Sequence, residues 1–329
     1  MKYVCLDQYS LPGADFSIEE KILQKYGIEC VIANARTDEE IIAVAKDADA
    51  IGTVYNQITP ELMDQLPQCR IFVRYGIGFD NINVPAATER GIVVCNLPRY
   101  CLKDVATHTI ALLLDICRKT TYLDKSVRQG NWSGNAGWPI HRIDDLTVGL
   151  VGFGNIARQT RKYLSGFDCK VIAYDPFLPQ EVFAAANAEK VELDELFAKA
   201  DVISVHLPLN EGTRHLINKE SLSKMKDGVI IINTARGPII CQDDLLEALK
   251  SGKVRAAGCD VFEKEPLTDL NDEIFGLNNL IINPHSAFNS CEAEIEQHES
   301  VAQSVVEVLV NKVVPYNAVN KQNLVPKAF

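Results

Sequence analysis

Short apolar runs alternate with amphipathic segments along most of the chain. In the first hundred residues, five runs rich in Val and Ile are bounded by turn residues, which is the pattern of buried strands. These runs are Tyr3–Leu6, Cys30–Ala33, Ala50–Val54, Ile71–Val73 and Ile92–Cys95. Three helices are predicted between them, over Ser17–Tyr26, Asp38–Lys46 and Pro60–Leu66. This alternation predicts a parallel sheet covered by helices on both faces.

A second set of strands and helices follows a long amphipathic segment, Asp104–Lys119, and a polar loop, Gln129–Gly137. Its six strand candidates are Thr147–Phe153, Val171–Tyr174, Val202–His206, Val229–Ile232, Ala256–Val261 and Leu280–Ile282. A last long helix is predicted from Glu292 to Lys312, after both sets. We therefore expect two α/β units, with the last helix packed on the first of them.

Composition and charge narrow the possible partners. The chain has 329 residues, 47% of them hydrophobic, and a net charge of −11, which disfavours nucleic acid as the main partner because such proteins need clustered Lys and Arg. No apolar run approaches the roughly 20 residues that span a bilayer, and Asp7 interrupts the start where a signal peptide would be apolar. We expect a cytoplasmic protein without a membrane segment.

The cysteines and histidines give no signal for a metal. The ten cysteines are scattered without a CxxC pair, so they are interpreted as small buried hydrophobes rather than as disulfide or zinc ligands. The histidines show no spacing of the HExxH kind. We therefore expect no bound metal.

A glycine-rich loop indicates a dinucleotide site. Gly152-Phe153-Gly154-Asn155-Ile156-Ala157 fits the G-x-G-x-x-G/A pattern, between a predicted strand and a predicted helix. Asp175 ends the next strand, 175 − 154 = 21 residues later, which suits an acidic residue that accepts hydrogen bonds from the ribose hydroxyls. An acidic side chain there repels a 2′-phosphate, so NAD is favoured over NADP. The alternative is a structural turn that binds nothing.

Charged residues follow three later strands, where open α/β sheets bind their ligands. They lie in Asn233–Gly237, Asp260–Pro266 and Asn283–Phe288, and a fourth segment, Val73–Asn81, lies in the first half. With the glycine-rich loop, these motifs occur in an order that resembles the D-isomer-specific 2-hydroxyacid dehydrogenase family. The segments around Arg74 and His285 are most similar to its C-terminal-binding-protein-like branch.

The resemblance implies a fold, an activity and residue roles. It implies a flavodoxin-like substrate domain of residues 1–101 and 289–329, and a Rossmann NAD-binding domain of residues 102–288, each a doubly wound parallel sheet. Members are usually homodimers that interconvert a 2-keto acid and a D-2-hydroxy acid. The implied catalytic residues are Arg236, Glu265 and His285, and the implied substrate-binding residues are Arg74, Ile77, Gly78 and Arg236. The implied cofactor-binding residues are Gly152, Gly154, Asn155, Ile156, Asp175, Leu207, Pro208, Thr213, Thr234, Ala235 and Asp260.

The residue types suit this chemistry. The planar guanidinium of Arg236 can hold a carboxylate and a ketone oxygen together. His285 can deliver a proton near neutral pH, and the Glu265 carboxylate can orient its ring and favour the imidazolium. Taken singly, Arg236 could be a surface charge at a helix C-cap, Glu265 a solvated loop carboxylate and His285 a satisfied buried histidine.

Three other functions stay open or are disfavoured. Phosphoglycerate dehydrogenases often carry a phosphate-binding Arg where this chain has Tyr55-Asn56-Gln57, and we expect no long C-terminal regulatory domain here. Formate dehydrogenases carry Gln at the position of Glu265. A dinucleotide-sensing scaffold remains possible, because sensor members of the branch keep the same three catalytic residue types.

Overall fold

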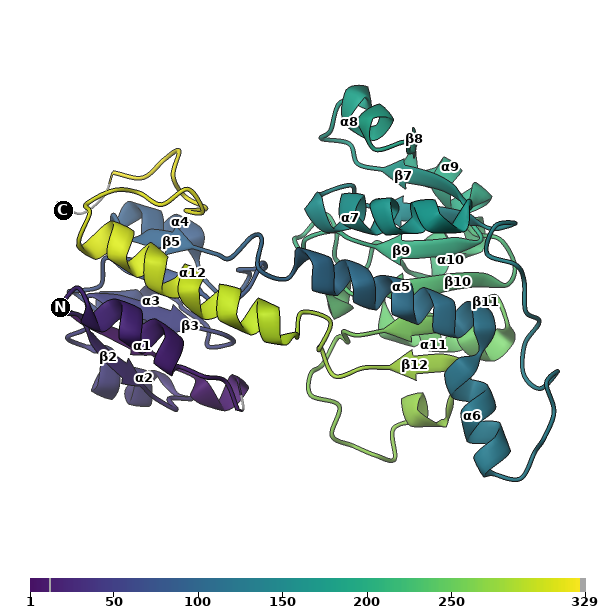
Figure 1. Cartoon of the computed structure of the whole chain (residues 1–329), viewed down its shortest axis with the longest axis horizontal. Helices are drawn as coiled ribbons and strands as arrows, with labels where there is room; N and C mark the ends of the chain where they lie inside the picture. The colour runs from purple at the N-terminus through teal and green to yellow at the C-terminus, as the bar shows by residue number, and fades with distance from the viewer. Residues whose placement is uncertain (12, 326–329) are drawn as a thin grey trace. The chain divides into compact units, whose positions relative to one another are not determined.

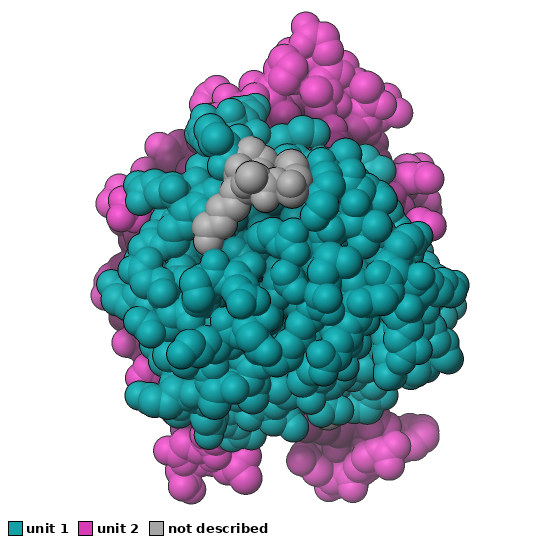
Figure 2. Space-filling model, turned by 90° about the vertical axis from the view of Figure 1, so that its left-hand side faces the viewer, with its two compact units in different colours: residues 1–101, 289–329 teal, residues 102–288 magenta. Residues whose placement is uncertain are grey.

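The computed structural model describes residues 1–11 and 13–325. Two compact units make up the chain: residues 1–101 with those from 289 onward form unit 1, and residues 102–288 form unit 2 (Figure 2). Each unit holds one parallel sheet between two layers of helices (Figure 1), because strands that are buried on both faces need helices on either side.

Unit 1 has a five-stranded sheet in the order β2-β1-β3-β4-β5, which is the flavodoxin-like order. Its strands are β1 (Lys2–Cys5), β2 (Glu29–Ile32), β3 (Ala50–Thr53), β4 (Ile71–Arg74) and β5 (Val93–Cys95). Every pair is parallel, with Tyr3 opposite Ala50 and Ala50 opposite Ile71. The flavodoxin-like prediction is therefore confirmed.

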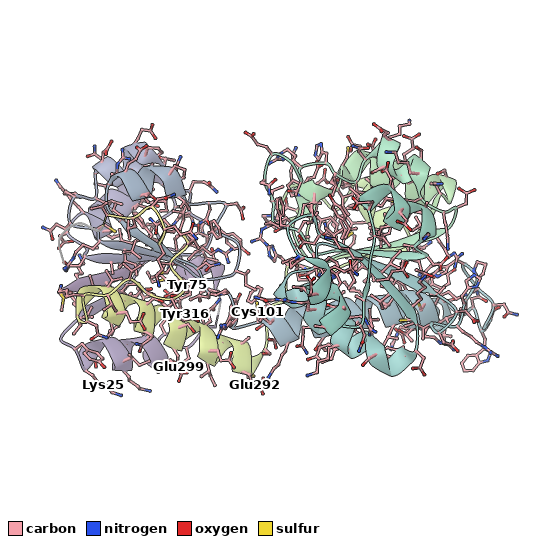
Figure 3. All side chains as sticks on the ribbon, turned by 90° about the horizontal axis from the view of Figure 1, so that it is seen from above. Lys25, Tyr75, Cys101, Glu292, Glu299 and Tyr316 are labelled. Carbon is pink, nitrogen blue, oxygen red and sulfur yellow. The ribbon has the colours of Figure 1, made fainter. Side chains whose placement is uncertain are left out.

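Among the described residues of unit 1, five α-helices cover the sheet. They are α1 (Ser17–Gln24), α2 (Asp38–Ala45), α3 (Pro60–Asp64), α4 (Val84–Glu89) and α12 (Cys291–Leu309). Residues of α2, α3 and α4 share one apolar core with the sheet, whereas α12 packs beside α1 and against β3 and β4 (Figure 1). On α12, Glu292 and Glu299 are exposed and point away from the sheet (Figure 3). The last helix thus packs on unit 1, as expected.

Unit 2 has a seven-stranded sheet in the order β12-β11-β10-β9-β6-β7-β8, again with parallel pairs. Its strands are β6 (Thr147–Val151), β7 (Lys170–Tyr174), β8 (Glu189–Lys190), β9 (Val202–Val205), β10 (Val229–Asn233), β11 (Val254–Cys259) and β12 (Leu280–Ile282). Counted from β6, the order is 3-2-1-4-5-6 with a seventh strand added, which is the Rossmann arrangement. The strand order reverses between β6 and β9, and ligands bind at that point in such sheets.

Helices cover both faces of the unit 2 sheet. They are α5 (Leu102–Arg118), α7 (Asn155–Leu164), α8 (Gln180–Ala185), α9 (Leu193–Lys199), α10 (Lys219–Lys224) and α11 (Gln242–Ser251). A further helix, α6 (Thr120–Arg128), follows α5 and contacts it. One apolar core joins the sheet to α5, α7 and α8, and another joins it to α9, α10 and α11. Short 3-10 turns lie at Gln8–Ser10, Ser165–Phe167, Gly237–Ile239 and Glu273–Gly276.

The structure departs from the predicted elements mainly in short helices. The pattern missed α4, α6 and α8 to α11, most of which have too few turns to show a helical period. A left-handed residue, Lys119 (φ 57°), separates α5 from α6. β6 ends at Val151, two residues early, because Gly152 adopts a φ of 91° that does not fit a strand.

Two further observations concern membranes and thiols. Among residues 1–11 and 13–325, we find no helix that combines the length and the apolar character needed to cross a bilayer. Seven of the ten cysteines are buried, as small hydrophobes would be, whereas Cys30 and Cys241 are half-buried and Cys291 is exposed.

Candidate active site

The glycine-rich loop lies at the end of β6, at the reversal of strand order in unit 2. A Cβ on Gly152 would lie 2.8 Å from the carbonyl oxygen of His206, and the φ of 91° is left-handed, so only glycine fits without strain. The Gly152 amide donates to the Tyr174 carbonyl at 2.8 Å. The Phe153 amide donates to Asp175 Oδ2 at 3.1 Å. The loop therefore lies directly against the acidic residue that the sequence assigns to the ribose.

The start of α7 fits a pyrophosphate. Gly154 is the N-cap, with Asn155 and Ile156 in the first turn, where backbone amides lack intrahelical acceptors. A Cβ on Gly154 would meet nothing within 4 Å, so the space beside the N-cap is open. Backbone amides and the helix dipole both favour an anion at such a position. Gly152, Gly154 and the first turn of α7 thus fit the diphosphate of a dinucleotide.

Gly154→Ala is expected to separate cofactor binding from folding. Because the added methyl meets no protein atom, we expect the loss of folding stability to stay below about 1 kcal/mol. The same methyl occupies the space of the pyrophosphate, so the NADH dissociation constant should rise roughly tenfold or more, the scale of a steric overlap of about 1–3 kcal/mol. Fluorescence titration with NADH and thermal melts measure the two effects.

A matched control is Gly276→Ala in the turn Glu273–Gly276, where an added Cβ also meets open space. It should leave both the stability and the NADH affinity unchanged. If Gly154→Ala bound NADH as tightly as this control does, the loop would not hold the pyrophosphate.

The segment after β9 lies beside the same loop. The side chain of Leu207 comes within 3.0 Å of the position of a Cβ on Gly152. Thr213 Oγ1 donates to the Pro208 carbonyl at 2.7 Å and accepts from the Asn210 amide at 2.9 Å, so Thr213 closes this segment on itself. Cofactor contacts of Leu207, Pro208 and Thr213 remain predictions.

Arg236 follows β10 in a turn that its neighbours hold. The buried side chain of Asn233 accepts from the Ala235 amide and donates to the Arg236 carbonyl, both at 3.0 Å. Arg236 Nη1 donates to the Ala235 carbonyl at 2.8 Å. A Cβ on Gly237 would lie 1.9 Å from the backbone of Phe262, so glycine allows the Arg236 turn to touch the segment after β11.

Glu265 and His285 form a close pair beside that turn. His285 Nδ1 and Glu265 Oε2 lie 2.7 Å apart, with side chains 23% and 30% exposed, and Glu265 Oε1 accepts from the Phe262 amide at 2.8 Å. Burial raises the pKa of Glu265, but the hydrogen bond and charge of His285, with help from the Phe262 amide and Arg236, bring the pKa below its usual value. The carboxylate is thus charged at neutral pH and orients the imidazole.

Asp260 holds the backbone that presents His285. Its buried carboxylate accepts from the Ser286 and Ala287 amides, both at 2.8 Å, and its carbonyl accepts from the His285 amide at 2.8 Å. These bonds keep His285 in a left-handed conformation with φ 54°, which is unusual for a residue other than glycine. Asp260 therefore positions the histidine, and its predicted contact with the nicotinamide stays a prediction.

The segment after β4 in unit 1 presents two backbone amides. Among the described residues, the amides of Ile77 and Gly78 donate no hydrogen bond, whereas Asn96 Nδ2 donates to the Ile77 carbonyl at 2.6 Å. Arg74 Nη1 donates to the carbonyl of Tyr75 at 2.9 Å. Tyr75 lies inside unit 1, its hydroxyl 2.8 Å from the Glu19 carboxylate (Figure 3). These amides can donate to a carboxylate ligand, as predicted for the substrate.

Comparison with known proteins decides the family. The family model described as "D-isomer specific 2-hydroxyacid dehydrogenase, NAD binding domain" matches residues 110–287, which is more than half of the chain. The chain belongs to the D-isomer-specific 2-hydroxyacid dehydrogenase family. Its family, its fold class and its NAD cofactor are thereby confirmed, and the chain is an NAD-dependent oxidoreductase of 2-keto and D-2-hydroxy acids.

Individual relatives of this dehydrogenase match over most of its length. A hydroxypyruvate reductase of Blautia hydrogenotrophica is 37% identical, over 98% of this chain and 100% of that protein. A D-3-phosphoglycerate dehydrogenase of Methanocaldococcus jannaschii is also 37% identical, but this chain spans only 57% of its length. The structure of D-lactate dehydrogenase from Aquifex aeolicus, complexed with NAD and lactic acid, superposes with a TM-score of 0.85 at 29% identity, over 94% of this chain and 96% of that one.

The dehydrogenase also uses supporting residues that the sequence did not reveal. Helix α5 contributes Thr109, whose buried hydroxyl lies 2.9 Å from that of Thr234. The preceding residue, His108, has Nε2 3.0 Å from Asn283 Oδ1 and 3.8 Å from Asp260 Oδ1. In the sequence, the only sign of these two residues is that they are polar within a mostly apolar helix. The fold is needed to show which side chains they contact.

Proposed function

We propose that this dehydrogenase reduces a small 2-keto acid to the D-2-hydroxy acid with Arg236, Glu265 and His285 as its catalytic residues. The observation that carries the proposal is the 2.7 Å contact between His285 Nδ1 and Glu265 Oε2, at the strand ends that also carry Arg236. A carboxylate that fixes an imidazole leaves Nε2 to exchange a proton with substrate, the arrangement of a general acid–base pair.

Each of the three residues has a distinct task. Bound NADH supplies the hydride to the ketone carbon. Arg236 binds the substrate carboxylate and polarises the ketone oxygen, and its positive charge favours the negative charge that develops there. His285 Nε2 donates a proton to that oxygen. Glu265 accepts a hydrogen bond from the Nδ1–H group and stabilises the imidazolium. Ile77 and Gly78 are proposed to bind the carboxylate through their backbone amides.

The substrate is proposed to be a short 2-keto acid such as hydroxypyruvate. The full-length similarity to a hydroxypyruvate reductase supports this choice. In the segment after β3, the amides of Val54, Tyr55 and Asn56 all donate to the buried carboxylate of Asp7. These amides are therefore not available to a substrate phosphate, and none of the side chains there is cationic, which argues against phosphoglycerate.

A panel of substrates tests this choice. NADH consumption should be followed at the nicotinamide absorbance with hydroxypyruvate, glyoxylate, pyruvate and 3-phosphohydroxypyruvate, which is the 2-keto acid that corresponds to 3-phosphoglycerate. Turnover of the unphosphorylated acids supports the proposal, and selective turnover of the phosphorylated one favours the phosphoglycerate alternative. Tight NADH binding without turnover of any member would indicate a dinucleotide-sensing scaffold instead.

Asp175→Ala is expected to reduce the preference for NADH over NADPH. The Asp175 carboxylate lies at the end of β7 and touches the glycine-rich loop, where it can accept from ribose hydroxyls and repel a 2′-phosphate. Both effects are lost with the carboxylate, so we expect the ratio of kcat/KM for the two cofactors to fall roughly tenfold, as for one charged hydrogen bond. An unchanged ratio would show that another residue selects the cofactor.

Glu265→Gln is expected to move the pH dependence of both reaction directions. The pKa of Glu265 lies below its usual value of 4.5, so its charge is present at neutral pH and disappears only in acid. Reduction needs protonated His285 and oxidation needs the neutral ring, so the reduction rate should fall, and the oxidation rate rise, with increasing pH. Without the carboxylate the imidazolium is less stable, and both inflections should shift to lower pH.

The measurement is a pair of pH–rate profiles for wild type and Glu265→Gln, in both directions and with a chelator in every assay. Glu195→Gln on α9, an exposed carboxylate paired with Lys199, serves as control and should follow wild type. Superimposable profiles for Glu265→Gln and wild type would mean that the carboxylate and the imidazole are not coupled in catalysis.

Homodimerisation and a cytoplasmic location complete the proposal. Family membership supports both, and unit 2 exposes two large apolar side chains, Trp132 and Ile140. Light scattering, with 36.4 kDa per chain, measures the assembly.

A further inference from the structure

Three side chains with metal-ligating atoms meet near the catalytic strand ends of unit 2. His215 lies in the segment after β9, Cys241 is the N-cap of α11, and Glu263 follows β11. One nitrogen, one sulfur and one carboxylate oxygen of this trio all lie within 4.8 Å of one another. His215 Nε2 and Glu263 Oε1 are 2.7 Å apart. None of the three has a part in the proposed hydride-transfer chemistry.

Main-chain hydrogen bonds fix the backbones that carry the trio. The His215 amide donates to the Pro238 carbonyl and the Cys241 amide to the Ile217 carbonyl, both at 2.8 Å. The Gln242 amide donates to Glu263 Oε1 at 3.2 Å, and the Glu263 amide donates back to Gln242 Oε1 at 3.4 Å. The three ligand-bearing segments are therefore joined before any ion binds, which lowers the ordering cost of forming a site.

The ligand set selects the class of ion. An imidazole nitrogen, a thiolate and a carboxylate suit Zn²⁺, which bonds them at about 2.0–2.3 Å in tetrahedral geometry. Such bond lengths place ligand atoms roughly 3–4 Å apart, so the His215–Glu263 contact must open slightly and Cys241 must approach by rotation of its side chain. The His215 and Glu263 side chains are 44% and 31% exposed, so an ion can reach them, and three protein ligands leave a fourth position for water.

We propose that His215, Cys241 and Glu263 form a zinc site that links the segments after β9, β10 and β11. The same segments carry Arg236 and Glu265, so the ion restrains the backbone on which the proposed catalytic residues lie. The three ligands are far apart in the sequence and follow different strands, and for this reason no spacing motif announces them. The site stands independently of the proposed function, because its test needs no turnover.

Cobalt provides a direct test, since Co²⁺ replaces Zn²⁺ and reports its ligands by absorption. Purified, reduced and chelator-treated protein should be titrated with CoCl₂. We expect saturation at one equivalent per chain, with a thiolate-to-cobalt charge-transfer band and the visible bands of tetrahedral cobalt, all removed by added ZnCl₂. No charge-transfer band, or a band that zinc does not remove, would overturn the proposal.

Variants assign the ligands. Cys241→Ser should abolish the charge-transfer band, and His215→Ala or Glu263→Gln should weaken Zn²⁺ binding by more than the ~10–100-fold that loss of an outer-shell partner costs. Cys291→Ser, at the exposed cysteine, is the matched control and should keep the band. If the band survived Cys241→Ser or disappeared in Cys291→Ser, the sulfur ligand would be wrong and the site refuted.

A second readout keeps the test valid if a ligand variant folds poorly. Zn²⁺ should raise the thermal midpoint of wild type and of Cys291→Ser, because an ion that binds the folded state stabilises it by mass action. The midpoint of Glu263→Gln, which keeps the size of the side chain, should not respond. A zinc response of equal size in Glu263→Gln would contradict the assignment.

Discussion

Replacement of His285 by alanine should lower kcat for 2-keto acid reduction by about 10²–10⁴, the usual contribution of a positioned general acid. The imidazole is held by Glu265 at 2.7 Å and by a turn that Asp260 fixes, so the proposed proton donor has a fixed position. NADH binding should persist, because the glycine-rich loop lies on β6 and α7 and does not include this side chain. Steady-state kinetics with NADH titration measures both quantities.

His141→Ala is the control for this experiment, since His141 is an exposed histidine of the loop before β6. It should retain wild-type kinetics. A His285→Ala enzyme whose kcat stayed within a few-fold of the control would remove His285 from its role as proton donor.

Arg236→Lys should lower kcat/KM for the keto acid by about 10- to 100-fold, which corresponds to one hydrogen bond between charged groups. Lysine keeps the charge but cannot bind a carboxylate and a ketone oxygen with one planar group. The Arg236 turn is held by Asn233 through the backbone, so the substitution should not disturb the fold. KM should rise and kcat should fall together, while the NADH dissociation constant stays unchanged.

Arg161→Lys offers a matched comparison. Arg161 lies in the last turn of α7, where its Nε donates to the Asn187 carbonyl, and its replacement should not alter keto-acid kinetics. Loss of NADH affinity in Arg236→Lys with unchanged keto-acid kinetics would mean that Arg236 serves the cofactor rather than the substrate.

The sheets could be predicted from the sequence because buried parallel strands are continuous apolar runs. All eleven predicted strands are present. Their alternation with helices restricts the fold to a few topologies of a parallel sheet. Short helices and strands were harder to predict from the sequence. β8 has two residues, Glu189–Lys190, and shows no apolar run, and α10, Lys219–Lys224, is too short for a helical period. Tertiary packing decides both.

The candidate site also contains residues that could be predicted from the sequence and residues that could not. The family resemblance predicts Arg236, Glu265 and His285 as catalytic residues, and the structure brings Glu265 and His285 into contact. The supporting residues could not be found in this way. Asp260 is predicted as a cofactor contact, and only the structure shows that its carboxylate also accepts from the amides of Ser286 and Ala287. Thr109 meets Thr234 from a helix 125 positions earlier in the chain, a contact that no local pattern encodes.

The most direct measurement of the central claim is the configuration of the product. The enzyme should be incubated with NADH and whichever of hydroxypyruvate and pyruvate it reduces faster, because glyoxylate gives an achiral product, and the hydroxy acid should be resolved on a chiral column. We expect one D-2-hydroxy acid to be formed for each NADH that is consumed. Formation of the L-isomer, or NADH binding without any hydroxy acid, would contradict the assignment of this chain as a D-2-hydroxyacid dehydrogenase.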